Sequence, residues 1–174
     1  SHFDTTKGHI EIRKAHAIDC TVDEAFDIEN LHPFKGNIDL EKLEAVYKSH
    51  PKEKIPFCLI TITCNSSGGQ PVSLENMKAV KELSDRYGIP IYFDSARFAE
   101  NAYFIKKREA GQENRTIKEI CKEVFSYGVG MTMSSKKDGL VNIGGFIALN
   151  DENIFRAASN MTIIYEGFIT YGGM

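Results

Sequence analysis

The sequence lacks an excess of basic residues, a long apolar run and paired cysteines, and each absence excludes a class of protein. Its 21 lysine and arginine residues are outnumbered by 24 aspartate and glutamate residues, which leaves a formal net charge of −3. Nucleic-acid binding needs basic side chains that neutralise phosphates, so no nucleic-acid partner is expected. No run approaches the roughly 20 apolar residues that span a bilayer, and the N-terminus does not resemble a signal peptide. We therefore expect a cytoplasmic protein with no membrane partner.

The four cysteines show no C-x-x-C spacing and no neighbouring histidine cluster. Structural zinc sites and thioredoxin-like redox sites both depend on such patterns, so neither is indicated. We interpret the cysteines as free thiols, and we expect Cys58 and Cys64, which lie in an apolar run, to be buried in the core.

The residues that are present have the composition of an ordinary globular domain. Hydrophobic residues make up 42% of the 174 residues and charged residues 26%, both close to the averages for soluble proteins. This composition supports a sizeable core, and the length has room for one domain.

The apolar residues alternate between helix-like and strand-like segments. Helices are predicted where apolar residues recur every three or four positions, and strands where short β-branched runs end in polar residues. In chain order the predictions are a helix over 38–50, a strand over 55–63, a helix from Ser73 to a stop at Gly88, a strand over 89–94, a helix through 102–105, a helix capped by Thr116 and Glu119, and strands over 131–134 and 145–149.

This alternation predicts an α/β protein with a parallel sheet flanked by helices. Ligands of such sheets bind beyond the carboxyl ends of the strands. Polar residues follow three of the predicted strands, over 65–69, 94–97 and 134–138, and we expect them at one edge of the sheet. Taken singly these signals are weak, because a strand-end aspartate often caps a helix and a lysine pair is commonly a solvated turn.

Together these segments resemble a known family. Segments 69–73, 94–105, 134–138, 165–168 and 171–173 are similar in order and spacing to the β-eliminating lyases, the family of tryptophanase and tyrosine phenol-lyase. The resemblance implies a pyridoxal-phosphate enzyme of the aspartate aminotransferase fold, fold type I, with a mostly parallel sheet flanked by helices. Residues 1–174 would be the central part of its large, cofactor-binding domain.

The resemblance implies roles for the polar residues at the strand ends. Lys137 would bind the cofactor covalently, with Lys136 as an electrostatic helper. The covalent bond needs a neutral amine, and a neighbouring ammonium together with burial disfavours protonation of Lys137. In an extended segment successive side chains point oppositely, so only one of the pair would face the cofactor. Asp94 would hold the pyridine nitrogen protonated.

Five further residues complete the implied site. Arg97 and Asn65 would contact the phenolate oxygen of the cofactor ring, and Ser134 would donate a hydrogen bond to the phosphate. Asn142 matches a position that helps to bind a monovalent cation, K⁺, and Tyr171 matches a tyrosine near the catalytic residues.

The implied reaction is β-elimination from an aromatic amino acid. Lys137 would remove the α-proton and the protonated arene would leave, which converts tryptophan to indole, pyruvate and ammonia. Segments 2–9, 34–39, 61–63, 95–96 and 166–168 favour tryptophanase. Segments 125–127 and 141–145 look as much like tyrosine phenol-lyase, so the conversion of tyrosine to phenol stays as an alternative.

The resemblance begins and ends inside the family's sequence, so we expect a fragment. It implies that the glycine turn for the phosphate, the aromatic that stacks on the ring and the arginine for the substrate carboxylate lie outside this chain. The family forms homotetramers, and the chain alone is expected to have little or no turnover. A non-catalytic fragment without bound cofactor is therefore a further alternative.

Two other enzyme classes are disfavoured. Ser134 and Lys137 satisfy the S-x-x-K motif of serine acyl-transferring enzymes, but the sequence lacks the companion motifs S-D-N and K-T-G. The run from Gly128 to Gly130 lacks the third glycine of a dinucleotide-binding loop and precedes a predicted strand rather than a helix.

Overall fold

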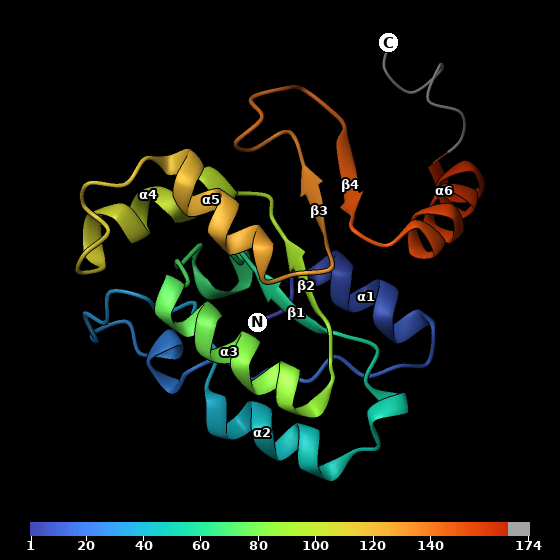
Figure 1. The fold of residues 1–174 in the computed structure, drawn as a ribbon, viewed down its shortest axis with the longest axis horizontal. Helices are drawn as coiled ribbons and strands as arrows, with labels where there is room; N and C mark the ends of the chain where they lie inside the picture. The colour runs from blue at the N-terminus through green and yellow to red at the C-terminus, as the bar shows by residue number, and fades with distance from the viewer. Residues whose placement is uncertain (167–174) are drawn as a thin grey trace.

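A four-stranded sheet in the order β1-β2-β3-β4 lies at the centre of the computed structural model, which describes residues 1–166 (Figure 1). Strands β1 (Cys58–Thr61), β2 (Ile91–Asp94) and β3 (Gly130–Ser134) are parallel. Strand β4 (Gly145–Leu149) pairs antiparallel with β3. The mostly parallel sheet predicted from the sequence is confirmed.

The structure refines two features of the predicted sheet. The run 55–63 forms a strand only over Cys58–Thr61, and residues 62 and 63 form a turn. The Ile62 N–H still donates to the Asp94 carbonyl oxygen of β2, at 2.7 Å. Strand β4 is antiparallel because only residues 135–144 join it to β3. A parallel crossover needs a dozen or more residues, usually including a helix.

Six α-helices accompany the sheet among residues 1–166. In Figure 1, α2 lies on the outer side of α3, α4 lies beside α5, and α6 lies beyond β4. The helices are α1 (Asp4–Ile12), α2 (Leu40–Ser49), α3 (Leu74–Tyr87), α4 (Phe98–Arg108), α5 (Ile117–Ser126) and α6 (Glu152–Glu166), with short 3₁₀ turns η1 (Asp23–Phe26), η2 (Lys52–Lys54) and η3 (Asn65–Ser67).

The predicted capping residues set the ends of three helices. The side chains of Asp39 and Ser73 accept hydrogen bonds from first-turn N–H groups of α2 and α3. Thr116 and Glu119 form the predicted capping box of α5. Gly88 ends α3 with φ 65°, a left-handed conformation that glycine adopts without steric cost. Local sequence signals therefore fix these boundaries.

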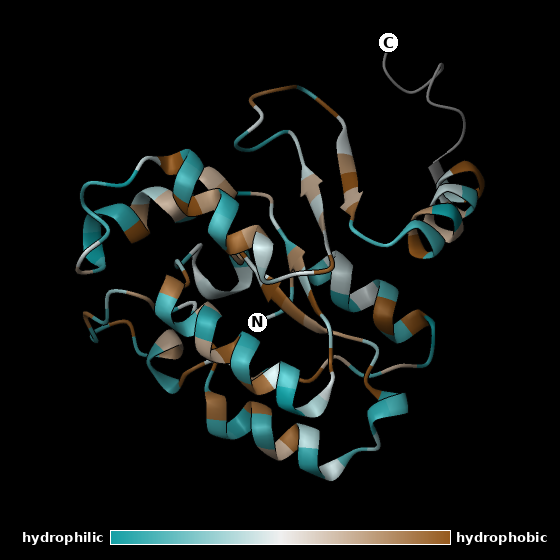
Figure 2. Cartoon of the chain, in the orientation of Figure 1, coloured by the Kyte–Doolittle hydropathy of each residue, from teal (hydrophilic) through white to brown (hydrophobic). Residues whose placement is uncertain are grey.

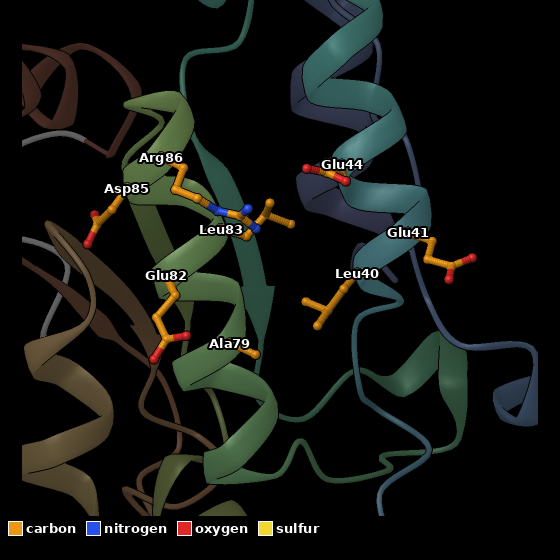
Figure 3. A pocket seen from close by; sticks show the side chains of 8 residues that line it. All are labelled: Leu40, Glu41, Glu44, Ala79, Glu82, Leu83, Asp85 and Arg86. Atoms are coloured by element: carbon orange, nitrogen blue, oxygen red, sulfur yellow. The ribbon is translucent and has the colours of Figure 1, made fainter.

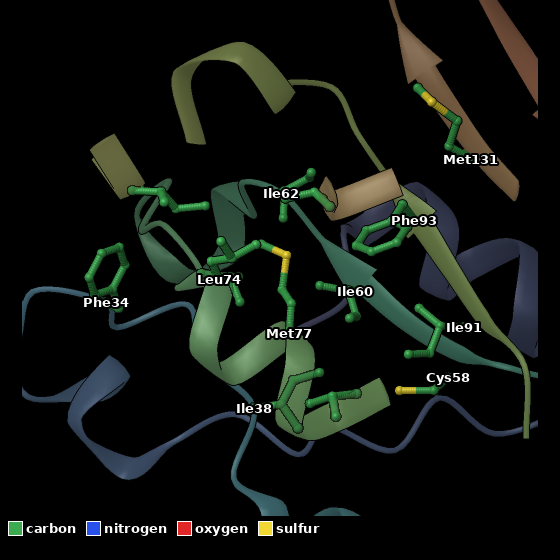
Figure 4. Packing of buried hydrophobic residues seen from close by; sticks show 14 of the residues in the cluster. Phe34, Ile38, Cys58, Ile60, Ile62, Leu74, Met77, Ile91, Phe93 and Met131 are labelled. Carbon is green, nitrogen blue, oxygen red and sulfur yellow. The ribbon is translucent and has the colours of Figure 1, made fainter. Parts of the chain in front are cut away.

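The hydrophobic core packs the parallel strands against the helices. Phe93 of β2 is fully buried and meets Phe125 of α5 edge-on, with ring centroids 5.8 Å apart. Ile60 of β1 and Met77 of α3 belong to the same cluster (Figure 4). Strand β1 is buried along most of its length, and alternate residues of β2 and β3 are buried. This packing holds the strand ends, where the predicted site lies, in fixed positions.

The region formed by β4 and α6 is far more exposed, and it carries apolar residues on its surface (Figure 2). Phe146 of β4 is 50% exposed and Ile164 of α6 is 70% exposed. Within residues 1–166, neither α6 nor any other helix is long and apolar enough to cross a membrane.

Candidate active site

The carboxyl ends of the three parallel strands lie at one edge of the sheet, as predicted. Thr61 at the end of β1 pairs in register with Asp94 at the end of β2, which in turn pairs with Thr132 of β3. Ser134 ends β3 two residues further on. The segments that begin at Asn65, Asp94 and Ser134 therefore leave the sheet from the same edge.

The lysine pair lies in a turn directly after β3. Residues 135 and 136 form a turn and residue 137 a bend, so the prediction of an extended segment is wrong. The two lysines nevertheless differ in environment, because Lys136 is exposed and Lys137 is half-buried. The Lys137 Nζ atom donates to the Ser134 Oγ atom at 3.2 Å. The turn therefore brings the Lys137 amine back over the end of its own strand.

The surroundings of Lys137 favour its neutral form. Burial lowers the pKa of the Lys137 ammonium, the positive charges of Lys136 and Arg97 lower it further, and the Asp94 carboxylate opposes them. An amine with a lowered pKa is a better nucleophile and base near neutral pH. The direction of this shift is the one that favours covalent binding of a cofactor aldehyde at Lys137.

Asp94 is a half-buried carboxylate whose hydrogen-bond partners among the described residues, the Thr6 hydroxyl and the Ala96 backbone, carry no charge. Burial raises the pKa of Asp94, and the Thr6 hydroxyl, which donates to its Oδ2 at 3.4 Å, the charge of Lys137 and the Ala96 backbone act in the opposite direction. A buried carboxylate of this kind is stabilised by a cationic or donor group placed against it. A protonated ring nitrogen would supply that group.

The N-terminal segment reaches the same edge, which the sequence analysis did not foresee. The Phe3 ring centroid lies 5.8 Å from the Lys137 Nζ atom, and the Ser66 hydroxyl donates to the Asp4 Oδ1 at 3.0 Å. We expected the aromatic ring of the site to lie outside this chain, whereas the structure brings one from within it. No periodicity surrounds Phe3, so only the tertiary fold reveals its position.

Arg97 and Asn65 lie beside this centre and not within hydrogen-bond contact of it among the described residues. Arg97 Nη1 donates to the Thr63 carbonyl oxygen at 3.4 Å, and its Nε lies 3.7 Å from a Glu100 carboxylate oxygen. Asn65 is exposed at the start of η3. Their predicted contacts with a cofactor ring therefore remain predictions.

The remaining two predicted residues have no geometric support in the described part of the chain. Asn142 is exposed in the loop between β3 and β4, and within residues 1–166 no group of three or more His, Cys, Asp or Glu side chains is placed to hold a metal ion. Tyr171 lies outside the described residues.

Buried hydroxyl groups without a hydrogen-bond partner in residues 1–166 surround the strand ends. Ser95 directly follows β2 and is fully buried, and Thr63 is 2% exposed. Unpaired buried polar atoms are rare in folded proteins and call for a partner. Together with the environments of Asp94 and Lys137, they make this edge fit a polar aromatic cofactor with an aldehyde. The unpaired atoms are Thr61 Oγ1, Thr63 Oγ1, Ser67 Oγ and Ser95 Oγ.

A groove lies between α2 and α3, away from the strand ends (Figure 3). Four of its eight lining residues are acidic, and none is a lysine, cysteine or histidine that could act as a nucleophile. Such a groove does not compete with the strand ends as a catalytic centre. It is lined by Leu40, Glu41, Glu44, Ala79, Glu82, Leu83, Asp85 and Arg86.

Known proteins resemble this chain over almost its whole length. The family model described as β-eliminating lyase matches residues 1–172. A Trichomonas vaginalis protein named "Probable beta-eliminating lyase" is 62% identical over the full chain. A tryptophanase of Salinibacter ruber is 51% identical over the full chain, and a tyrosine phenol-lyase of Lacrimispora saccharolytica is 50% identical over 99% of it. The chain spans 37–38% of the length of these relatives.

A solved structure supports the fold. A proposed L-allo-threonine aldolase of Listeria monocytogenes superposes with a TM-score of 0.64 and 19% sequence identity, over 94% of this chain and 38% of that one. At this identity the likeness concerns the fold alone. The predicted fold class, a mostly parallel sheet flanked by helices as in fold type I, is confirmed.

Proposed function

Because the chain belongs to the β-eliminating lyase family, we propose that it forms the central part of the cofactor-binding domain of a pyridoxal-phosphate-dependent carbon–carbon lyase. The substrate is an aromatic amino acid, with tryptophan, cleaved to indole, pyruvate and ammonia, as our first choice. The observation that carries this proposal is the half-buried Lys137 amine, with its lowered pKa, at the same strand ends as Asp94.

Each residue at the strand ends has a defined task in this proposal. When bound, pyridoxal phosphate supplies an electron sink for the charge left by the α-proton. The Lys137 amine would hold the cofactor, and the free amine would accept the α-proton at Nζ. The Asp94 carboxylate keeps a proton on the ring nitrogen. Phe3 offers an apolar face to the ring, and the Ser134 hydroxyl donates to the phosphate.

The structure also bears on the choice of substrate. The segment 2–9, which resembles tryptophanase, places Phe3, Asp4 and Thr6 at the candidate site. The segment 141–145, which looks as much like tyrosine phenol-lyase, lies largely in the exposed loop before β4. We infer tryptophan from this difference in position, and tyrosine stays the second candidate because the two named relatives are 51% and 50% identical.

Three further properties are proposed from the resemblance alone. The complete protein would be a cytoplasmic homotetramer, and K⁺ would bind near Asn142. Arg97, Asn65 and Tyr171 would complete the site around cofactor and substrate. The 174-residue chain alone would turn over little or no substrate, since its named relatives are more than twice as long.

The test uses the full-length protein with pyridoxal phosphate, supplied with tryptophan and tyrosine in separate assays. We expect indole and pyruvate from tryptophan, and we expect Lys137→Ala to abolish their release. Phenol release without indole would replace the first choice by the second. A full-length protein that releases neither arene would overturn the proposed function and favour a non-catalytic role.

A further inference from the structure

Asp138 joins the loop that carries Lys137 to the N-terminus of α4. Its Oδ2 accepts hydrogen bonds from the backbone N–H groups of Ala99 at 2.7 Å and Glu100 at 3.1 Å. Its own backbone N–H donates to the Ala96 carbonyl oxygen at 3.4 Å. A single residue thus ties the loop that follows β3 to the segment that follows β2.

Helix α4 needs this outside acceptor because its own N-cap residue cannot provide one. The N-cap is Arg97, whose guanidinium has only donors, and it makes no side-chain capping hydrogen bond. The N–H groups of the first helical turn require an acceptor, and a carboxylate there also interacts favourably with the helix dipole. Asp138 supplies the cap from another loop, which leaves the charged side chain of Arg97 beside the site.

We propose that Asp138 is a positioning residue that holds Lys137 opposite Asp94. It does so by fastening the lysine loop, residues 135–144 between β3 and β4, to the start of α4. The inference rests on the proposed function, since it concerns the placement of the cofactor-binding lysine. Asp94 lies four residues before the first residue of α4, and Lys137 directly precedes Asp138. Movement of Asp138 away from α4 would therefore separate Lys137 from Asp94.

The proposal predicts the direction in which Lys137 responds. The groups that act on its amine are Lys136, Arg97 and Asp94, together with burial, and their sum lowers the pKa of Lys137. Release of the loop into solvent weakens burial and the effects of Arg97 and Asp94 together. Because the sum of these effects lowers the pKa, their loss lets the pKa of Lys137 rise toward its ordinary value. A direct charge effect of Asp138 has the opposite sign, because loss of a nearby carboxylate lowers the pKa of an ammonium.

Glu109 provides a matched control. Its two carboxylate oxygens accept from the backbone N–H groups of Leu74 at 2.7 Å and Glu75 at 2.8 Å, which caps α3. Like Asp138, it satisfies two first-turn N–H groups from a distant part of the sequence. It lies at the C-terminal end of α4 and not in the lysine loop, so its removal tests the loss of a cap alone.

The experiment measures the pKa of Lys137 by competitive labelling of amines with acetic anhydride across pH, read by peptide mass spectrometry. It compares the parent chain, Asp138→Ala, Asp138→Asn and Glu109→Ala, and it needs no cofactor. We expect the pKa of Lys137 to rise in Asp138→Ala. It should stay at the parent value in Glu109→Ala. It should not rise in Asp138→Asn, whose amide oxygen accepts the same hydrogen bonds and whose loss of charge acts only to lower the pKa of Lys137.

An unchanged or lowered pKa of Lys137 in folded Asp138→Ala overturns the proposal. If Asp138→Ala does not fold, Asp138→Asn decides, because a pKa of Lys137 that rises above the parent value in this variant contradicts a capping role. In the full-length protein, Asp138→Ala should bind pyridoxal phosphate about tenfold more weakly or worse, since small displacements of reacting groups have large effects. Failure of the parent protein to bind the cofactor at Lys137 overturns the proposed function and leaves the labelling result standing.

Discussion

The parallel strands β1–β3 and the region formed by β4 and α6 share one sheet but are stabilised very differently. Phe93 in β2 is fully buried between helices and strands, whereas Phe146 in β4 is 50% exposed. The first region buries most of β1 and alternate side chains of β2 and β3, and the second leaves many apolar side chains on the surface (Figure 2). The candidate site lies where the two regions meet, because Lys137 belongs to the loop between β3 and β4.

This difference affects how firmly the two halves of the candidate site, Asp94 and Lys137, are fixed in position. Asp94 ends a strand whose alternate side chains are buried, so its position is set by the core. The Lys137 loop is anchored on one side by β3 and continues into the exposed β4 on the other. Its anchor within the packed region is Asp138, which caps α4. Burial therefore places Asp94, one half of the proposed catalytic pair, and a polar contact places Lys137, the other half.

The largest expected effect contrasts two phenylalanine truncations. Phe93→Ala leaves a cavity in the packed region and should lower the free energy of unfolding by about 3–5 kcal/mol. Phe146→Ala removes a side chain that is already 50% exposed, and it should lower the free energy of unfolding by less than about 1 kcal/mol. Urea denaturation of the two variants, followed by circular dichroism, measures the difference. Equal losses would show that the two regions do not differ as described.

A smaller expected effect concerns Asp94, whose ionised carboxylate lowers the free energy of unfolding at neutral pH. Because burial raises the pKa of Asp94, the folded chain binds this proton more tightly than the unfolded chain does. The associated stability is present below the ordinary aspartate pKa of about 3.9 and is lost as pH rises through the raised value. In the chain without cofactor, Asp94→Asn should therefore raise the free energy of unfolding at pH 7.

The control for this prediction is Asp85→Asn, which alters an exposed carboxylate paired with Lys81 on α3. Exposed pairs contribute little, so this variant should not gain stability at pH 7. The comparison uses urea denaturation at pH 4 and pH 7. An Asp94→Asn variant that is less stable than the parent at pH 7 would contradict the view that the ionised carboxylate is costly there.

Much of the fold could be predicted because its signals are local. Asp39, Ser73, Gly88 and the capping box at Thr116 each act within one helical turn, and each prediction is confirmed. The polar ends of β1, β2 and β3 could be assigned to one edge because parallel strands share a direction. The antiparallel course of β4 follows from the short connection over 135–144, which periodicity alone does not report. The early end of β1 lies inside a continuous apolar run, so the run does not mark it.

The site was predictable only in part for the same reason. Lys137 and Asp94 follow strands, so topology brings them to one edge. Phe3 and Thr6 reach that edge from the N-terminal segment, and Asp138 acts through a hydrogen bond to a helix 39 residues earlier in the chain. Contacts between such distant segments leave no periodic mark in the sequence.

The most direct test of the central claim asks which lysine binds the cofactor. The full-length protein is incubated with pyridoxal phosphate, reduced with borohydride, digested, and mapped by mass spectrometry for the modified residue. The structure predicts modification at Lys137, retained in Lys136→Ala and lost in Lys137→Ala, because the Lys137 amine is half-buried at the strand ends while Lys136 is exposed. Modification of Lys136 in the parent protein, or of neither lysine, would contradict the assignment of this edge as the catalytic centre.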